Sequence, residues 1–138
     1  MALVGGGGAG NIAGRNPSGT SSNVNYIGNH IYGYSGSVDV NGDETTMLEF
    51  GTGQQYIICK IQFNYIQHDS DNILYKIYIN DEIVQAVETD RANVSHLLPG
   101  DVFHILIAGE SRVKLTAQNT TGSSNRPQIV SLTGRVYA

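Results

Sequence analysis

Hydrophobic and polar residues alternate with a period of two along much of the chain after residue 23. Over residues 56–66 the alternation separates an apolar face from a polar one. The apolar face comprises Ile57, Cys59, Ile61, Phe63 and Tyr65, and the polar face comprises Lys60, Gln62 and Asn64. Because successive side chains of a strand point to opposite faces of its sheet, this pattern predicts a long, half-buried strand.

Other segments with the same alternation predict a chain built from strands. They are residues 30–40, 44–50, 75–79, 82–84, 102–108, 113–119 and 128–137. No segment longer than one turn shows the 3.6-residue period of an amphipathic helix. About eight short strands at this spacing predict one all-β antiparallel domain, a sandwich or barrel, over residues 24–138.

Turn-forming residues separate several of these strands. Asn80-Asp81 joins residues 75–79 to residues 82–84 and predicts a tight hairpin. Asn41-Gly42 lies between two predicted strands and also predicts a hairpin, because Asn and Gly tolerate the positive φ that both central residues of such a turn adopt. Pro99-Gly100-Asp101 predicts a turn before residues 102–108.

Residues 1–23 have a different composition from the rest. They contain seven of the seventeen glycines, and Arg15 is their only charged residue. Such a segment loses much backbone entropy on ordering, so in isolation it is expected to be flexible. Two interpretations remain open: a disordered tail, or an N-terminal arm that becomes ordered on a neighbouring subunit. An arm would use Leu3, Val4 and Ile12 as apolar anchors, together with Arg15.

Composition narrows the classes of function. Charged residues make up only 14% of the chain, against a typical value of about 25%. The net charge is −4, and the eight Lys and Arg residues do not cluster, which argues against binding to nucleic acid. No run approaches the ~18 apolar residues of a membrane span. Faces rich in uncharged polar residues are cheap to desolvate, which favours binding to another protein.

The residues that carry catalytic or metal chemistry form no recognisable constellation. Asp39, Asn41 and Asp43 alternate as calcium ligands would, but the glycine and glutamate that a calcium loop requires are not at matching positions. Residues 68–71, His-Asp-Ser-Asp, fall between two predicted strands. Neither the activated nucleophile nor the oriented base of a triad can be placed there, so a loop is favoured. We expect a protein that is not an enzyme and that has no metal or cofactor.

The remaining candidates are single residues or small groups. His30, His96 and His104 are dispersed, which favours surface or structural roles. Cys59 alternates with apolar residues, which predicts a buried free thiol. Three tyrosines follow the glycine-rich segment and either pack within a sheet or supply contact area for a partner. They are Tyr26, Tyr32 and Tyr34.

The order of strands and turns over roughly residues 24–138 resembles that of small jelly-roll decoration (cement) proteins of bacteriophage capsids. The resemblance lies in the Tyr-Lys-Ile-Tyr-Ile-Asn-Asp hairpin of residues 75–81, the turn at residues 99–101, the strand at residues 113–119 and the closing Gly-Arg-Val-Tyr of residues 134–137. It implies a jelly-roll-like sandwich that forms a homo-oligomer, often a trimer.

The same resemblance implies a function in the virion. Such a protein, made in the host cytoplasm, would bind the major capsid protein on the outer capsid surface and stabilise the capsid by bridging its subunits. The alternative is a carbohydrate- or receptor-binding β-sandwich of a phage fibre or spike. The lack of tryptophan, a common platform for sugar rings, weighs against that alternative.

Overall fold

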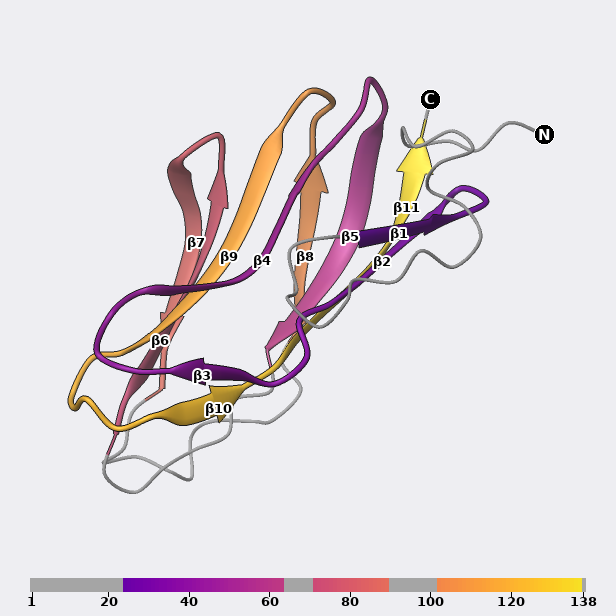
Figure 1. Ribbon diagram of the computed structural model, residues 1–138. Coiled ribbons are helices and arrows are strands. Elements are labelled where there is room, and N and C mark those ends of the chain that lie inside the picture. The colour runs from indigo at the N-terminus through magenta and orange to yellow at the C-terminus, as the bar shows by residue number, and fades with distance from the viewer. Residues whose placement is uncertain (1–23, 64–70, 90–101, 138) are drawn as a thin grey trace.

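The computed structural model describes residues 24–63, 71–89 and 102–137, all of which lie in strands or their connections (Figure 1). No helix among these residues is long and apolar enough to cross a membrane. The glycine-rich segment, Tyr65, residues 68–70, His96 and the turn at residues 99–101 lie outside the described residues. The structure confirms the predicted all-β fold.

The described residues form eleven antiparallel strands in two main sheets and one small one. The five-stranded sheet has the order β1 (Val24–Ile27), β2 (His30–Tyr34), β11 (Val130–Tyr137), β5 (Tyr56–Phe63) and β8 (Val102–Ile107). The four-stranded sheet has the order β4 (Thr45–Gly51), β9 (Arg112–Asn119), β6 (Ile73–Ile79) and β7 (Glu82–Glu88). The small sheet pairs β3 (Val38–Val40) with β10 (Arg126–Gln128) at one end of the molecule (Figure 1).

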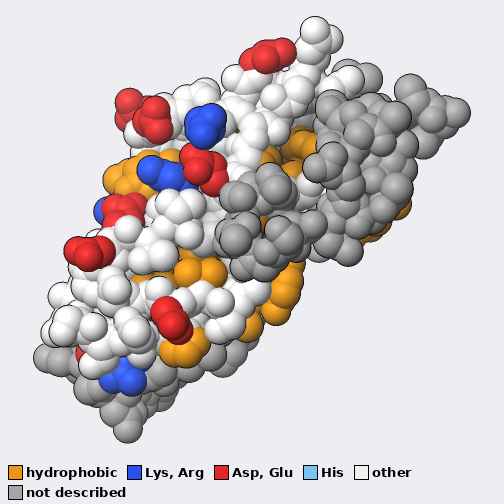
Figure 2. Space-filling view, viewed as in Figure 1, with side chains coloured by type: hydrophobic (Ala, Val, Ile, Leu, Met, Phe, Trp, Pro, Cys, Tyr) orange, Lys and Arg blue, Asp and Glu red, His pale blue; other side chains and the backbone are white. Residues whose placement is uncertain are grey.

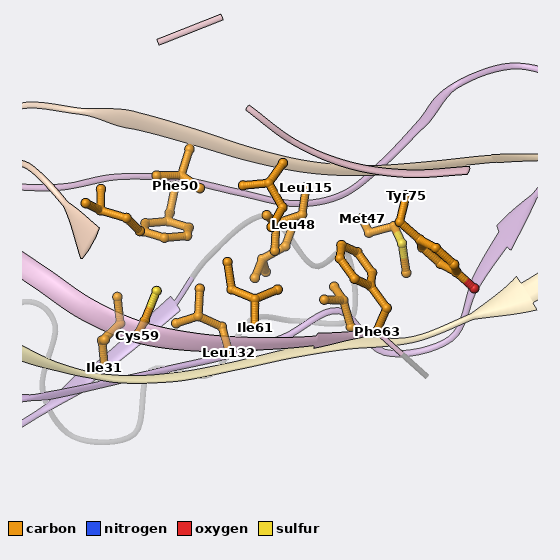
Figure 3. Packing of buried hydrophobic residues seen from close by; sticks show 14 of the residues in the cluster. Ile31, Met47, Leu48, Phe50, Cys59, Ile61, Phe63, Tyr75, Leu115 and Leu132 are labelled. Carbon is orange, nitrogen blue, oxygen red and sulfur yellow. The ribbon is translucent and has the colours of Figure 1, made fainter. Parts of the chain in front are cut away.

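The two main sheets bury their apolar faces against each other and form a β-sandwich (Figure 3). On β5 the predicted apolar residues Ile57, Cys59, Ile61 and Phe63 are buried, whereas Lys60 and Gln62 are exposed. Phe63 meets Tyr75 of the opposite sheet with a distance of 4.6 Å between ring centroids. Full burial of each large apolar side chain contributes about 1.5–3 kcal/mol, so this interior is the main source of stability.

A β-bulge in β4 adds a residue to this interior. The pairing of β4 with β9 shifts between Thr46 and Leu48. Met47 and Leu48 are therefore both buried, although adjacent residues of a regular strand would point to opposite faces. The bulge fills the space between the sheets with two side chains in succession.

Positive φ angles explain two of the tight turns. Asn80 and Asp81 have φ values of 52° and 67°, so the predicted hairpin between β6 and β7 is confirmed. A second two-residue hairpin joins β1 to β2, with Gly28 at a φ of 62° in its first central position. Glycine adopts this conformation at no steric cost, which is why the chain reverses at this residue.

The predicted hairpin at Asn41-Gly42 is wrong. Neither residue has a positive φ, and β3 pairs with β10 whereas β4 pairs with β9. The connection instead carries the chain from the small sheet into the four-stranded sheet. The side-chain oxygen of Asn41 accepts a hydrogen bond from the backbone N–H of Asp43 at 2.9 Å, and its carbonyl accepts one from the N–H of Asn119 at 2.8 Å.

Residues 30–40 also do not form the single strand that their pattern predicts. They divide into β2 and β3 around Gly36, which has a φ of 68°. This break lets the two halves join different sheets, so the structure has more strands than the predicted eight or so. The finer assignment of the sandwich to a jelly roll stays a prediction.

Candidate binding surface

The candidate surface is the outer face of the five-stranded sheet, meaning the side chains of β1, β2, β11, β5 and β8 that point away from the interior. The strand register aligns these side chains in rows that cross all five strands. One row comprises Asn25, Tyr32, Thr133, Lys60 and His104, and the next comprises Ile27, His30, Arg135, Ile58 and Leu106. Segments far apart in the sequence thus contribute to one continuous surface.

A groove of about 290 Å³ runs over the central strand β11. Its floor includes Thr133, Gly134 and Arg135. His30 and Tyr32 of β2 line it, and from the other side so do Ile58 and Lys60 of β5 with His104 of β8. Because Thr133 is shorter than Tyr32 and Lys60 on either side of it in the same row, the surface dips between β2 and β5.

Gly134 lies under this groove, where β11 and β5 approach each other closely. A Cβ atom added at Gly134 would lie 2.6 Å from the Cβ of Cys59 and 2.8 Å from the carbonyl oxygen of Ile58. Real Cβ atoms do not approach other atoms so closely, so any other residue would force the two strands apart. The absence of a side chain at Gly134 is thus a condition for the pairing that supports the groove.

The charge on the outer face is of one sign. The five strands contain no Asp or Glu, and their permanent cations are Lys60 and Arg135. Neither forms an ion pair within the described part of the chain. The Arg135 guanidinium lies 5.8 Å from the centroid of the Tyr137 ring, which leaves its hydrogen-bond donors available. The face is therefore cationic although the protein as a whole is acidic.

Exposed apolar side chains accompany these cations. Ile27 and Leu106, at the two ends of one row, are each 58% exposed, and Ile58 within that row is 44% exposed. Tyr34, 56% exposed, extends the apolar surface on β2. Exposed apolar residues grouped on one face, unlike scattered ones, are typical of surfaces that bind a partner.

The three tyrosines that follow the glycine-rich segment do not share one face of the sheet. Tyr32 and Tyr34 lie on the outer face, but Tyr26 pairs with Ile31 and is buried on the opposite side of the sheet. Burial raises the pKa of Tyr26, and its hydroxyl has no hydrogen-bond partner among the described residues. Of these tyrosines, two belong to the candidate surface.

The other predicted binding residues, Leu3, Val4, Ile12 and Arg15, lie outside the described residues. The structure instead groups Lys60, Arg135, Ile58 and two histidines around the groove. The sequence had shown the histidines only as dispersed residues. His30 and His104 lie 74 positions apart in the sequence, yet both line the groove. The outward position of Lys60 was available from the alternation, but its neighbours were not.

The other candidates for chemistry serve the structure of the domain. Asp71 pairs with Arg126, with 2.5 Å between Oδ2 and Nε, and this hydrogen bond lowers the pKa of the carboxyl group against the opposing effect of burial. Cys59 is buried, and burial raises the pKa of its thiol to about 12, far from the range of a reactive thiolate. Within the described ranges, no three His, Cys, Asp or Glu residues are grouped to hold a metal ion.

Comparison with known proteins does not assign the chain to a family. No family model matches it, and no curated protein matches it in sequence.

Proposed function

We propose that this protein is a binding and assembly protein that decorates the outer surface of a phage capsid and bridges neighbouring subunits of the major capsid protein. The observation that carries the proposal is the outer face of the five-stranded sheet. On that face, apolar side chains are exposed beside cations that form no ion pair within the described residues. The resemblance to decoration proteins supplies the expected partner.

Rigidity of the outer face supports a role in assembly. β11 and β5 each pair with strands on both sides, and buried side chains anchor them from below. A surface held in this way loses little conformational entropy on binding, so more of its contact energy appears as affinity. This property suits a protein whose task is to hold neighbouring subunits together.

The chemistry of the outer face favours binding over catalysis. A catalytic histidine is usually oriented by a carboxylate, as in the Ser-His-Asp triad. No strand of this sheet carries Asp or Glu, so His30 and His104 have no such partner on the strands around them. We therefore propose contact roles for both.

Assembly into a homo-oligomer, a trimer in the favoured version, belongs to the same proposal. Several copies joined together would present several outer faces, and each additional contact with the capsid would act at a high effective concentration. The glycine-rich segment with Leu3, Val4, Ile12 and Arg15 would supply contacts between subunits or with the capsid.

The test is the composition of purified particles. Phage particles from a producing culture would be banded on a density gradient, and this protein and the major capsid protein would be quantified by mass spectrometry. The proposal requires this protein in the particle band at a fixed ratio to the capsid protein. Its absence from particles, or specific binding on a glycan array by a protein found only in fibres, would overturn the proposal in favour of a receptor-binding module.

Deletion of residues 1–23 separates the arm from the folded domain. If the arm contributes to assembly, the truncated protein binds particles more weakly than the full chain. Equal binding by the two proteins contradicts the arm and leaves the outer face as the contact surface.

A further inference from the structure

We propose that the groove over β11 is a binding site for an acidic, extended polypeptide segment of the partner, with Lys60 and Arg135 as its charged contacts. This inference deepens the proposed function and rests on it, in that the segment would belong to the surface that the protein decorates.

Charge complementarity determines the class of ligand. Lys60 projects from β5 and Arg135 from β11, in adjacent rows, and both side chains are exposed. His30 and His104 supply further nitrogen donors at the groove. Carboxylates are the groups that such donors bind best, and an arginine guanidinium can bind a carboxylate through two parallel hydrogen bonds. No Asp or Glu lies on the five strands, and neither Lys60 nor Arg135 forms an ion pair within the described residues, so carboxylates of a partner can bind both cations.

The apolar part of the surface indicates a polypeptide rather than a small anion. The row that contains Arg135 begins at Ile27 and ends at Leu106. Adjacent strands lie about 4.8 Å apart, so a row across five strands is roughly 19 Å long, the span of about six extended residues. An extended segment could place carboxylates near the central cations and apolar side chains over Ile58 and Leu106.

Two other occupants fit less well. A second copy docked through the same face would bring Lys60 and Arg135 of the two copies together, and like charges directly opposite each other are destabilising. A nucleic acid site usually neutralises several phosphates, whereas this face has two permanent cations within a chain of net charge −4. The combination of few cations and exposed apolar side chains favours an acidic protein segment.

The direct test uses a capped peptide of six glutamates as the probe, with six-glutamine and six-lysine peptides as controls. Each peptide would be titrated into the ¹⁵N-labelled full chain and followed by NMR chemical shifts. The inference requires that the glutamate peptide shift the signals of Tyr32, Lys60, Thr133 and Arg135, and that the controls do not. Equal binding of the lysine peptide, or shifts centred on the four-stranded sheet, would overturn it.

A matched pair of variants separates the groove from net charge. Lys60→Gln/Arg135→Gln removes two positive charges from the groove, and Arg112→Gln/Lys114→Gln removes two from the outer face of the other sheet. Because the first variant loses two exposed charge contacts, it should bind the glutamate peptide on the order of tenfold more weakly. An equal loss in the second variant would show that only overall charge matters, which contradicts the groove.

The same variants on phage particles distinguish this inference from the proposed function. If the protein occupies particles and Lys60→Gln/Arg135→Gln occupies them as tightly, the groove inference fails and the decoration function stands. If the glutamate peptide binds in the groove but the protein is absent from particles, the function fails and the acidic-segment site stands.

Discussion

The outer faces of the two sheets use their charged residues in opposite ways. On the four-stranded side, the carboxylate of Glu44 accepts hydrogen bonds from Tyr78 at 2.6 Å and Thr116 at 2.7 Å, and it lies 3.6 Å from the Lys76 ammonium. Glu49 pairs with Arg112 at 3.1 Å between Oε2 and Nε on the same face. Figure 2 shows basic and acidic side chains intermingled over this part of the molecule.

The network around Glu44 also perturbs the protonation of its members. Burial raises the pKa of Glu44, but the hydrogen bonds from Tyr78 and Thr116 and the nearby lysines outweigh it, so the pKa lies below its ordinary value. The hydrogen bond between Tyr78 and Glu44, with smaller effects of burial and of the carboxylate charge, raises the pKa of Tyr78 to about 12. The carboxylate is thus stabilised within the sheet itself.

The five-stranded sheet, in contrast, holds cations that no carboxylate of its own strands neutralises. The two sheets share one interior, so this difference in the use of charge lies in their outward-facing side chains. One sheet thus uses its charges within the domain, whereas the two cations of the other form no ion pair within the described residues, as the proposed binding of a partner requires.

The largest expected change in the free energy of unfolding comes from substitution of a glycine in the five-stranded sheet, and a glycine of the four-stranded sheet serves as its control. Gly134→Ala places a Cβ against the backbone of β5 and should destabilise the domain by about 2 kcal/mol or more, as overpacking does. Gly51→Ala in β4 meets only the Ser111 carbonyl oxygen at 3.7 Å and should change the free energy of unfolding by no more than about 0.5 kcal/mol. Urea denaturation measures both variants, and equal losses would show that the two strands are equally crowded.

Removal of the Glu44 carboxylate should have the next largest effect. Glu44→Ala leaves Tyr78, Thr116 and Lys76 without their shared partner, and hydrogen bonds to a charged group lead us to expect a loss of about 1–2 kcal/mol in the free energy of unfolding. The pKa of Tyr78 should fall toward its ordinary value of 10.0, which NMR of labelled tyrosine can follow. A Tyr78 pKa that stays at about 12 in this variant would contradict the network.

The stability lost in Glu44→Ala should depend on pH, and the direction of this smaller effect follows from the lowered pKa of Glu44. Because the pKa of Glu44 is lowered on folding, its stabilising contribution is complete above the ordinary value of 4.5 and is lost as the pH falls through the lowered folded value. The difference in unfolding free energy between wild type and Glu44→Ala should therefore be greatest at neutral pH and shrink in acid. A difference that stays constant down to the acid limit of folding would assign the effect to packing.

The smallest effect is expected on the five-stranded sheet. Lys60→Gln/Arg135→Gln removes two exposed cations that form no ion pair within the described residues, so the free energy of unfolding should change by no more than about 0.5 kcal/mol. Thermal denaturation at low salt checks this expectation. A loss as large as that of Glu44→Ala would break the comparison, because these cations would then be stabilising the domain.

Local sequence patterns predict the features that depend on neighbouring residues. The alternation around Cys59 predicts which side chains of β5 are buried, and Asn80-Asp81 predicts the β6–β7 hairpin, because both depend on the chain within a few residues. The same signal fails at Asn41-Gly42, where β10 and β9 are available as partners for the flanking strands. Turn propensity cannot outweigh long-range pairing, and a single sequence does not reveal such pairing.

The candidate surface depends even more on long-range pairing. Tyr26 pairs with the buried Ile31 across the β1–β2 hairpin, so alternation along these strands would have placed Tyr26 in the interior. This inference requires the hairpin to be recognised at Gly28. The groove requires β11 to lie between β2 and β5, strands that are separated from it by more than 60 residues. The charges on each strand can be counted from the sequence, but the strands that share a sheet cannot be identified from it.

The central position of β11 has a consequence for how the chain folds as it is made. Translation proceeds from the N-terminus, and β11 follows all the other described strands, yet it alone joins the β1–β2 hairpin to the β5–β8 pair. Until residues 130–137 leave the ribosome, β2 and β5 each have one edge without a partner strand. Nascent chains that stall before β11 is made would expose two strand edges that can pair with another chain. Chaperones that shield such edges should therefore matter most during the last stage of synthesis.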